Sequence, residues 1–108
     1  MPDDEIVFQD EHYDGFFGDG GGVVVARLAH PLEYETDSWT SINNLPDEFK
    51  SVLKYRVMGD EYLQSVLQDD EAIWCLSKLQ RNGEHISNIV LFFYRPSNRT
   101  VIEWILHT

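Results

Sequence analysis

The chain has little cysteine, few basic residues and no long apolar run, and each scarcity narrows what it can be. Cys75 is the only cysteine in 108 residues, so no intramolecular disulfide can form, which is typical of a reducing compartment. The longest apolar run, residues 89–94, is far too short to cross a bilayer. The acidic start Met1-Pro2-Asp3-Asp4-Glu5 is unlike the basic start of a signal peptide. We therefore expect a cytoplasmic protein that does not bind membranes.

Basic residues are outnumbered by acids, and the imbalance is concentrated early in the chain. Eight Lys and Arg stand against nineteen Asp and Glu, which gives a formal net charge of −11. Residues 1–37 carry ten of the acids and one base, Arg27, whereas residues 38–108 carry nine acids and seven bases. A field of this sign repels nucleic acid and attracts basic protein surfaces. Solubility alone is the alternative explanation for the acidity.

The length and composition predict a single α+β domain over residues 1–108. An apolar content of 43% supplies a core without disulfide or metal support. Residues 1–22 are expected to form an acidic, partly loop-like segment, and residues 23–108 the α+β core. Within the first segment, residues 6–8 suit a short strand, whereas residues 9–22 are polar and glycine-rich and are interpreted as a long loop.

The C-terminal part of the chain predicts a three-stranded antiparallel meander. Its strands are expected over residues 72–80, 85–94 and 99–107, where apolar and β-branched residues dominate. Asn82-Gly83 is a strong hairpin signal, and Pro96-Ser97 suits the second turn. With Asn82-Gly83 at the tip, Trp74 is expected opposite Leu91.

Two short helices are expected before the meander. Asn44 can cap the first, whose apolar stripe comprises Phe49, Val52, Leu53 and Val57, and Asp60 can cap the second. Together with a strand over residues 23–29, these elements predict an antiparallel sheet of four to five strands with two helices packed on one face.

The meander is apolar on both of its faces, so the face without helices needs another cover. That cover is expected to be the N-terminal segment, a second copy of the chain or a partner. Glu103 lies between Ile102 and Trp104 on this pattern and is interpreted as either a buried acid or an interface carboxylate.

No set of residues in the sequence predicts catalysis. In the expected pairing, Cys75 and His85 lie about 17 Å apart along the hairpin, too far for a nucleophile and its base. The glycine run over residues 18–22 precedes a strand and lacks the lysine of a phosphate-binding loop. We therefore expect a protein that is not an enzyme and has no cofactor.

Asp10, His12 and Asp14 alternate before a glycine, as the ligands of a calcium loop do. Gly21 stands where such a loop needs its bidentate glutamate, so a solvated acidic loop is the preferred interpretation and no metal is expected.

The acidic N-terminal third is instead the candidate partner-binding surface. Two aromatic residues within its acidic stretch can supply buried contact area, while the acids steer a basic partner. The candidate residues are Asp10, Glu11, Asp14, Phe16, Phe17, Asp19, Glu33, Glu35 and Asp37.

Small size, strong acidity and an α+β core without catalytic groups favour an inhibitor that masks the basic surface of a nucleic-acid-handling protein. Immunity proteins of nuclease toxins and phage anti-defence proteins that mimic DNA work in this way, because their carboxylates take the places of phosphates. The expected partner is thus a basic, nucleic-acid-binding protein, with no direct contact to nucleic acid. The alternative is an accessory protein–protein interaction module of a larger assembly, and a homodimer is a further option.

Overall fold

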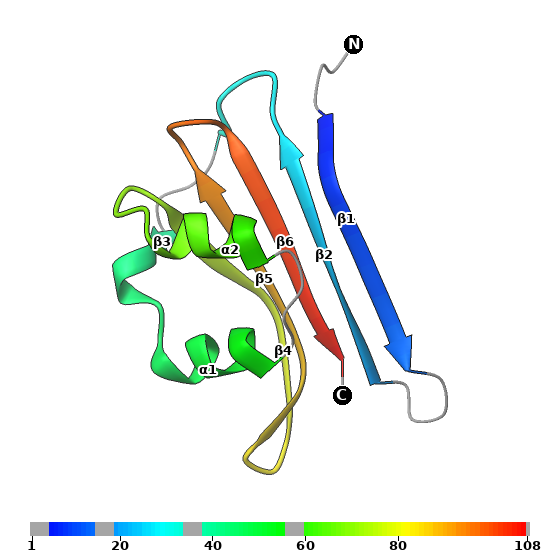
Figure 1. Cartoon of the computed structure of the whole chain (residues 1–108). Coiled ribbons are helices and arrows are strands. Elements are labelled where there is room, and N and C mark those ends of the chain that lie inside the picture. The colour runs from blue at the N-terminus through cyan, green and yellow to red at the C-terminus, as the bar shows by residue number, and fades with distance from the viewer. Residues whose placement is uncertain (1–4, 15–18, 34–37, 56–59, 108) are drawn as a thin grey trace.

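The computed structural model describes residues 5–14, 19–33, 38–55 and 60–107, and their backbone forms one antiparallel sheet with helices on one face. The sheet has six strands in the order β1-β2-β6-β5-β4-β3 (Figure 1). The α+β class is therefore confirmed. The six strands exceed the predicted four to five because Thr40–Ser41 adds the short strand β3, while the strands predicted over residues 6–8 and 23–29 are present as the longer β1 and β2.

The predicted C-terminal meander is confirmed. Its strands are β4 (Ile73–Asn82), β5 (His85–Arg95) and β6 (Thr100–His107). They are consecutive in the sequence and adjacent in the sheet, as short connections favour. β3 pairs with the start of β4, and the Trp74 indole Nε1 donates to the Ser41 carbonyl across this pair at 3.1 Å.

The register of the β4–β5 hairpin differs from the prediction. Asn82 pairs with His85, so the two turn residues are Gly83 and Glu84 rather than Asn82 and Gly83. Gly83 has φ of 66°, which glycine adopts without the steric cost that other residues bear. Trp74 consequently lies opposite Phe93 instead of Leu91. Because this shift is two residues, Trp74 stays on the helix side of the sheet.

The β5–β6 connection forms around Pro96 and Ser97, as predicted, and ends at a residue in an unusual conformation. Arg95 pairs with Thr100, which leaves four residues in the loop. Arg99 has φ of 56°, in the left-handed region that disfavours side chains with a Cβ. Its carbonyl accepts a hydrogen bond from Leu28 N at 2.8 Å, which ties the loop to the end of β2.

The helices begin where charge and proline favour it. α1 (Asp47–Tyr55) starts after Pro46, whose carbonyl accepts hydrogen bonds from Phe49 N and Lys50 N. Asn44 is therefore not the cap of this helix; it ends a short 3₁₀ helix, η2 (Ile42–Asn44). The predicted Val57 lies outside the described residues.

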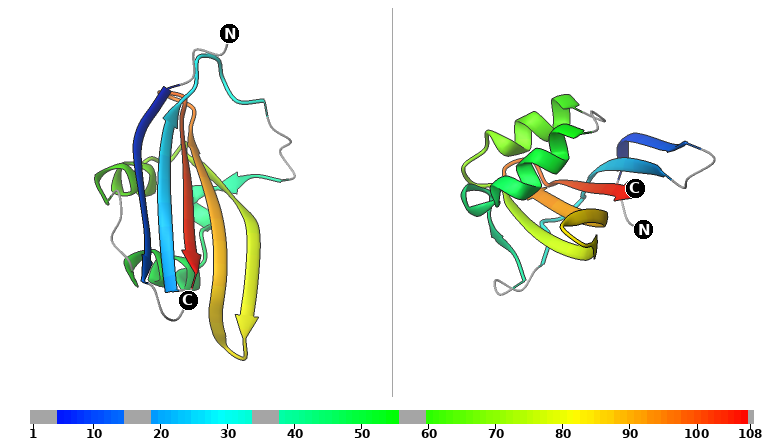
Figure 2. Two further views of the ribbon diagram at one scale, coloured as in Figure 1. Left: turned by 90° about the vertical axis from the view of Figure 1, so that its right-hand side faces the viewer. Right: turned by 90° about the horizontal axis from the view of Figure 1, so that it is seen from below.

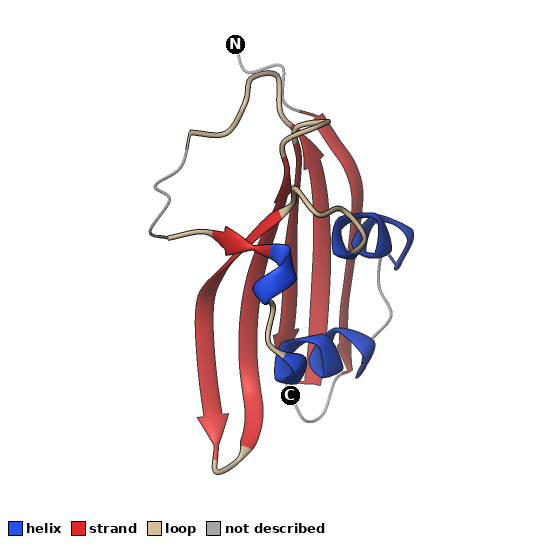
Figure 3. Cartoon of the chain, turned by 90° about the vertical axis from the view of Figure 1, so that its left-hand side faces the viewer, coloured by secondary structure: helices blue, strands red, loops and turns tan. Residues whose placement is uncertain are grey.

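α2 (Asp60–Leu67) matches the second predicted helix, and the two α-helices cross one side of the sheet (Figures 2 and 3). The core forms between this side and the helices. It draws alternate residues from β2, β5 and β6 and the inward stripes of both helices. Its fully enclosed members include Val23, Val25, Val66, Ile89, Leu91, Phe93, Ile102 and Trp104.

The interpretation of residues 9–22 as a long loop is wrong for residues 9–14 and 19–22, and residues 15–18 lie outside the described residues. β1 (Glu5–Asp14) and β2 (Asp19–Arg27) form an antiparallel hairpin, and β2 also pairs along its length with β6. The glycine run continues this strand, with Gly21 and Gly22 buried between β1 and β6. Residues 5–27 thus extend the sheet sideways. They do not cover its second face, as one of the predicted alternatives required.

Candidate functional site

Four of the predicted partner-binding acids lie on the β1–β2 hairpin. Asp10, Glu11 and Asp14 belong to the second half of β1, and Asp19 begins β2. Asp14 is the direct partner of Asp19 in the ladder. We call these four residues the acidic hairpin. The fold therefore spreads them along one half of the hairpin, from Asp10, which lies opposite Val23, to the Asp14–Asp19 pair; β1 and β2 run side by side at one edge of the sheet (Figure 1).

The pairing of Asp14 with Asp19 sets two carboxylate residues opposite each other. Opposite residues in an antiparallel pair have Cβ atoms about 5 Å apart, and like charges at this distance destabilise the hairpin. A cation or a basic side chain between the two strands would relieve that repulsion. The backbone register thus adds a physical reason for this end of the hairpin to attract positive charge.

β1 is also an outer strand of the sheet. It pairs with β2 on one side, and no described strand pairs with its other side. An edge of this kind exposes backbone donors and acceptors, and acidic residues along it oppose pairing with another acidic strand. Three of the four acidic-hairpin residues, Asp10, Glu11 and Asp14, therefore belong to an edge strand.

The other candidate residues are placed differently. Glu33 is exposed in the chain that follows β2, and Leu32 beside it donates its N–H to the Tyr94 hydroxyl at 3.1 Å. Tyr94 lies near the end of β5, so Glu33 is at the opposite end of the sheet from Asp19. β2 alone separates these ends by about 26 Å at roughly 3.3 Å per residue. Phe16, Phe17, Glu35 and Asp37 lie outside the described residues.

The structure does not support the alternative of a calcium-binding loop. Asp10, His12 and Asp14 are successive alternate positions of a strand, about 7 Å apart from one to the next, rather than positions in a loop that wraps a cation. Among the side chains that the structure describes, no three His, Cys, Asp or Glu residues cluster as metal ligands.

The second face of the sheet is apolar and is not covered by the helices. It takes the alternate residues of β2, β5 and β6 that the core does not use. These side chains are half-buried against one another: Val24, Val90, Phe92, Val101 and Ile105. We call them the open face. Glu103 lies among them, paired with Val24 on one side and Phe92 on the other.

Glu103 and Cys75 both belong to this face rather than to the core. Glu103 is half-buried, so it is neither enclosed in the core nor fully exposed. Cys75 pairs with Phe92 and is likewise half-buried. Burial raises the pKa of the Cys75 thiol, which disfavours the nucleophilic thiolate. His85 pairs with Asn82, seven positions further along β4, which confirms that the two residues are far apart.

Sequence reasoning predicted residues 6–8 as a strand but missed its continuation over residues 9–14, and with it the acidic edge of the sheet. The usual signal for a strand is an alternation of apolar and polar residues, which arises where one face is buried. Residues 9–14 lack it, because an outer strand does not need an apolar face. A weaker signal was present in the Asp-Gly pairs at residues 14–15 and 19–20, which are frequent in hairpin turns.

Comparisons of the chain with protein-family models, with curated proteins and with solved structures found no match. None of the helices formed by residues 5–14, 19–33, 38–55 and 60–107 is long and apolar enough to span a membrane.

Proposed function

We propose that the protein is a non-enzymatic binding protein that masks the basic surface of a nucleic-acid-handling protein, as an immunity protein or a phage anti-defence protein that mimics DNA. The observation that supports the proposal is the acidic hairpin: three acidic residues on the edge strand β1 and a fourth, Asp19 of β2, directly opposite Asp14. Phosphates of nucleic acid present a comparable row of negative charges, and a basic cleft releases the same counterions to either.

Charge alone does not account for a lasting complex. Exposed ion pairs contribute roughly 0–1 kcal/mol each, so carboxylates mainly accelerate association. Phe16 and Phe17 lie in the sequence between Asp14 and Asp19. In the proposal these rings bury area on the partner and slow dissociation, and Glu33, Glu35 and Asp37 contribute a second acidic contact.

The experiment compares three forms of the chain as baits for basic proteins in a lysate. The first is the wild type, and the second carries D10N, E11Q, D14N and D19N. The third is a control with the same change in charge elsewhere, E61Q, D70N, E71Q and E84Q, all at exposed positions. We expect the wild type and the control to retain a nucleic-acid-binding protein at low salt, and the hairpin variant to lose it.

The recovered partner then decides the function. Addition of the wild-type chain should displace labelled DNA or RNA from the partner, and the hairpin variant should not. Equal retention of the partner by all three forms would contradict the proposal, because the acids of the hairpin would then serve solubility alone.

The open face supports the alternative function of an accessory interaction module. Its half-buried aliphatic side chains suit a partner that adds a layer to the sheet, or a second copy of the chain. This function predicts retention of a partner that is insensitive to the four hairpin substitutions and is lost in V90D. The capture experiment therefore separates the two functions.

A further inference from the structure

Two arginines and a threonine form a row across three strands at the end of the sheet opposite the acidic hairpin. Arg27 of β2 pairs with Thr100 of β6, and Thr100 pairs with Arg95 of β5. Directly paired residues lie on the same face of a sheet, and this face is the one covered by the helices, since Val25 and Ile102 next along the ladder are buried. Two strand spacings separate the Cα atoms of the two arginines by about 10 Å.

The row borders a pocket of about 210 Å³ between α2 and the sheet. α2 contributes Tyr62 and Ser65, β1 and β2 contribute apolar side chains, and the β5–β6 loop contributes an amide. The described lining residues, none of which carries a carboxylate, are Val7, Val25, Arg27, Tyr62, Ser65, Arg95, Asn98 and Thr100. In a chain with a net charge of −11, two guanidinium groups in one described lining are an exception that solubility does not explain, although one of them, that of Arg95, is paired with Asp69.

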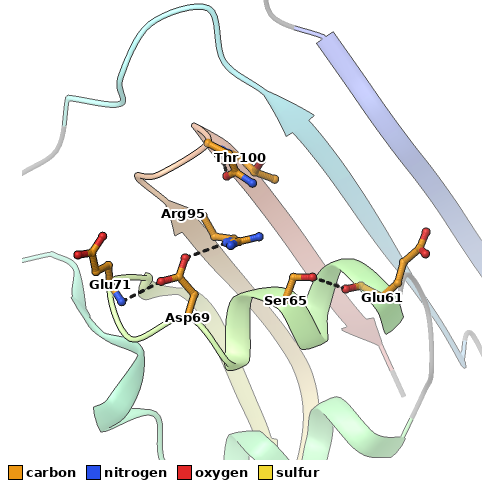
Figure 4. A network of polar contacts seen from close by, with 7 residues as sticks. Glu61, Ser65, Asp69, Glu71, Arg95 and Thr100 are labelled. Atoms are coloured by element: carbon orange, nitrogen blue, oxygen red, sulfur yellow. Dashed lines mark hydrogen bonds and ion pairs between the residues drawn. The ribbon is translucent and has the colours of Figure 1, made fainter.

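Arg95 is held in position from outside the pocket. Its Nε donates to Asp69 Oδ2 at 2.9 Å, and Asp69 Oδ1 accepts from Glu71 N at 3.0 Å (Figure 4). The Arg95 hydrogen bond lowers the pKa of the Asp69 carboxyl, so this anchor stays ionised near neutral pH. Because the anchor uses Nε, the two terminal nitrogens of Arg95 remain as donors toward the pocket.

Other donors lie beside the arginines. The Asn98 side-chain oxygen accepts from Thr100 N at 3.2 Å, which leaves the Asn98 amide nitrogen as a donor. Thr100 contributes a hydroxyl from a buried position between the two arginines. Ser65 does not add a donor, because its hydroxyl donates to the Glu61 carbonyl at 2.9 Å. The pocket therefore offers hydrogen-bond donors from two guanidinium groups, a hydroxyl and an amide. A carboxylate has only two oxygens to accept them, whereas a phosphate has three or four, so a phosphate is the better match.

We propose that this pocket binds a phosphate group, either inorganic phosphate or the head of a small phosphomonoester. Arg27 and Arg95 hold the phosphate oxygens from two sides, Thr100 and Asn98 donate between them, and Val7, Val25 and Tyr62 contact the organic part of an ester. The acidic exterior excludes long polyanions. A small dianion reaches the arginines because salt screens the surrounding carboxylates beyond roughly 8–10 Å. The site is at the far end of β2 from the acidic hairpin and does not depend on the proposed function.

The test titrates the full chain with inorganic phosphate and with phenyl phosphate, followed by isothermal titration calorimetry and by the rise in melting temperature. Sodium chloride at matched ionic strength and sodium acetate serve as reference salts. We expect saturable binding of the phosphates, with little effect of either reference salt. Tighter binding of phenyl phosphate would identify a monoester as the ligand, and equal binding would identify free phosphate.

Arg27→Gln is the informative variant, because Arg27 is exposed and its loss leaves the Asp69–Arg95 pair intact. Loss of a charge-assisted contact should weaken phosphate binding about tenfold. Arg99→Gln is the matched control: Arg99 is an exposed arginine next to Thr100 that does not line the pocket, and its variant should bind within about twofold of the wild type. Equal weakening in both variants, acetate binding as tight as phosphate binding, or no saturable binding would each overturn the proposal.

Discussion

Charged residues are used in opposite ways in the β1–β2 hairpin and in the rest of the sheet with its helices. In the helix-covered region, acids meet bases: Asp69 pairs with Arg95, and Glu48 Oε2 accepts from Arg81 Nη2 at 3.0 Å. Both pairs lower the pKa of the carboxyl, chiefly through the arginine hydrogen bond. In the hairpin, Asp14 instead lies opposite Asp19. The difference is that the printed ion pairs of the first region join acids to bases, whereas the ladder of the hairpin places two acidic residues opposite each other.

The apolar residues show the same division. The meander and the helices supply most of the hydrophobic core. The β1–β2 hairpin adds Val23 and Val25 from β2, and Val7 of β1 packs against the core. Because β1 contributes little to the core, substitutions of its surface residues should cost little stability.

The largest effect is expected in the core of the meander. Trp104 is fully buried, so Trp104→Ala should lower the free energy of unfolding by about 3–5 kcal/mol. Ile105 is the matched control on the next position of β6: it belongs to the open face, and Ile105→Ala should cost about 1 kcal/mol. Urea denaturation measures both values. Equal costs would mean that the open face is covered as thoroughly as the core.

An intermediate effect is expected at the Asp69–Arg95 pair. The side chains are 14% and 26% exposed, and Asp69→Asn should cost about 1–2 kcal/mol at neutral pH. Because the pKa of Asp69 is lower in the folded state, its contribution is present above the unfolded pKa of about 4 and is lost as the pH falls through the folded pKa. Melting temperatures of the variant should therefore converge on those of the wild type in acid. A constant difference at every pH would show that the ionised pair is not the cause.

The smallest effect, and one of opposite sign, is expected in the hairpin. Asp14→Asn removes one of two opposed carboxylates and should raise the free energy of unfolding by about 0.2–0.5 kcal/mol at low salt. Since the gain comes from repulsion between two like charges, it should shrink as salt is added. A loss of stability at low salt would mean that Asp14 has a stabilising contact in the folded chain.

The sequence predicted the meander and both helices because their signals are strong. The apolar and β-branched runs of the meander and the apolar stripe of the first helix depend on local chemistry that the final fold preserves. The turn of the β4–β5 hairpin lies one residue later than predicted, because Gly83 can occupy either turn position. The pairing of the two strands also shifts at irregularities near Ser77 and Ser87. Such adjustments depend on packing across the whole sheet, which a local pattern does not report.

The sites were less predictable than the fold. The four acids of the hairpin were identified from charge, but their arrangement on an edge strand depends on pairings of β2 with both β1 and β6. The row joins Arg27 to Arg95 and Thr100, which are more than 60 positions further along the sequence, and it exists because β2 and β5 both flank β6. No spacing along the chain indicates such a row.

The most direct test of the account measures how association with the recovered basic partner depends on salt. Surface plasmon resonance at increasing ionic strength should show fast, steeply salt-dependent association for the wild type and for the control with substitutions at residues 61, 70, 71 and 84. The variant with neutral residues at 10, 11, 14 and 19 should associate more slowly and with a flatter salt dependence. Truncation of Phe16 and Phe17 to Ala should speed dissociation and leave the salt dependence of association unchanged. Unchanged association of the hairpin variant at low salt would contradict the claim that the acidic hairpin recognises the partner.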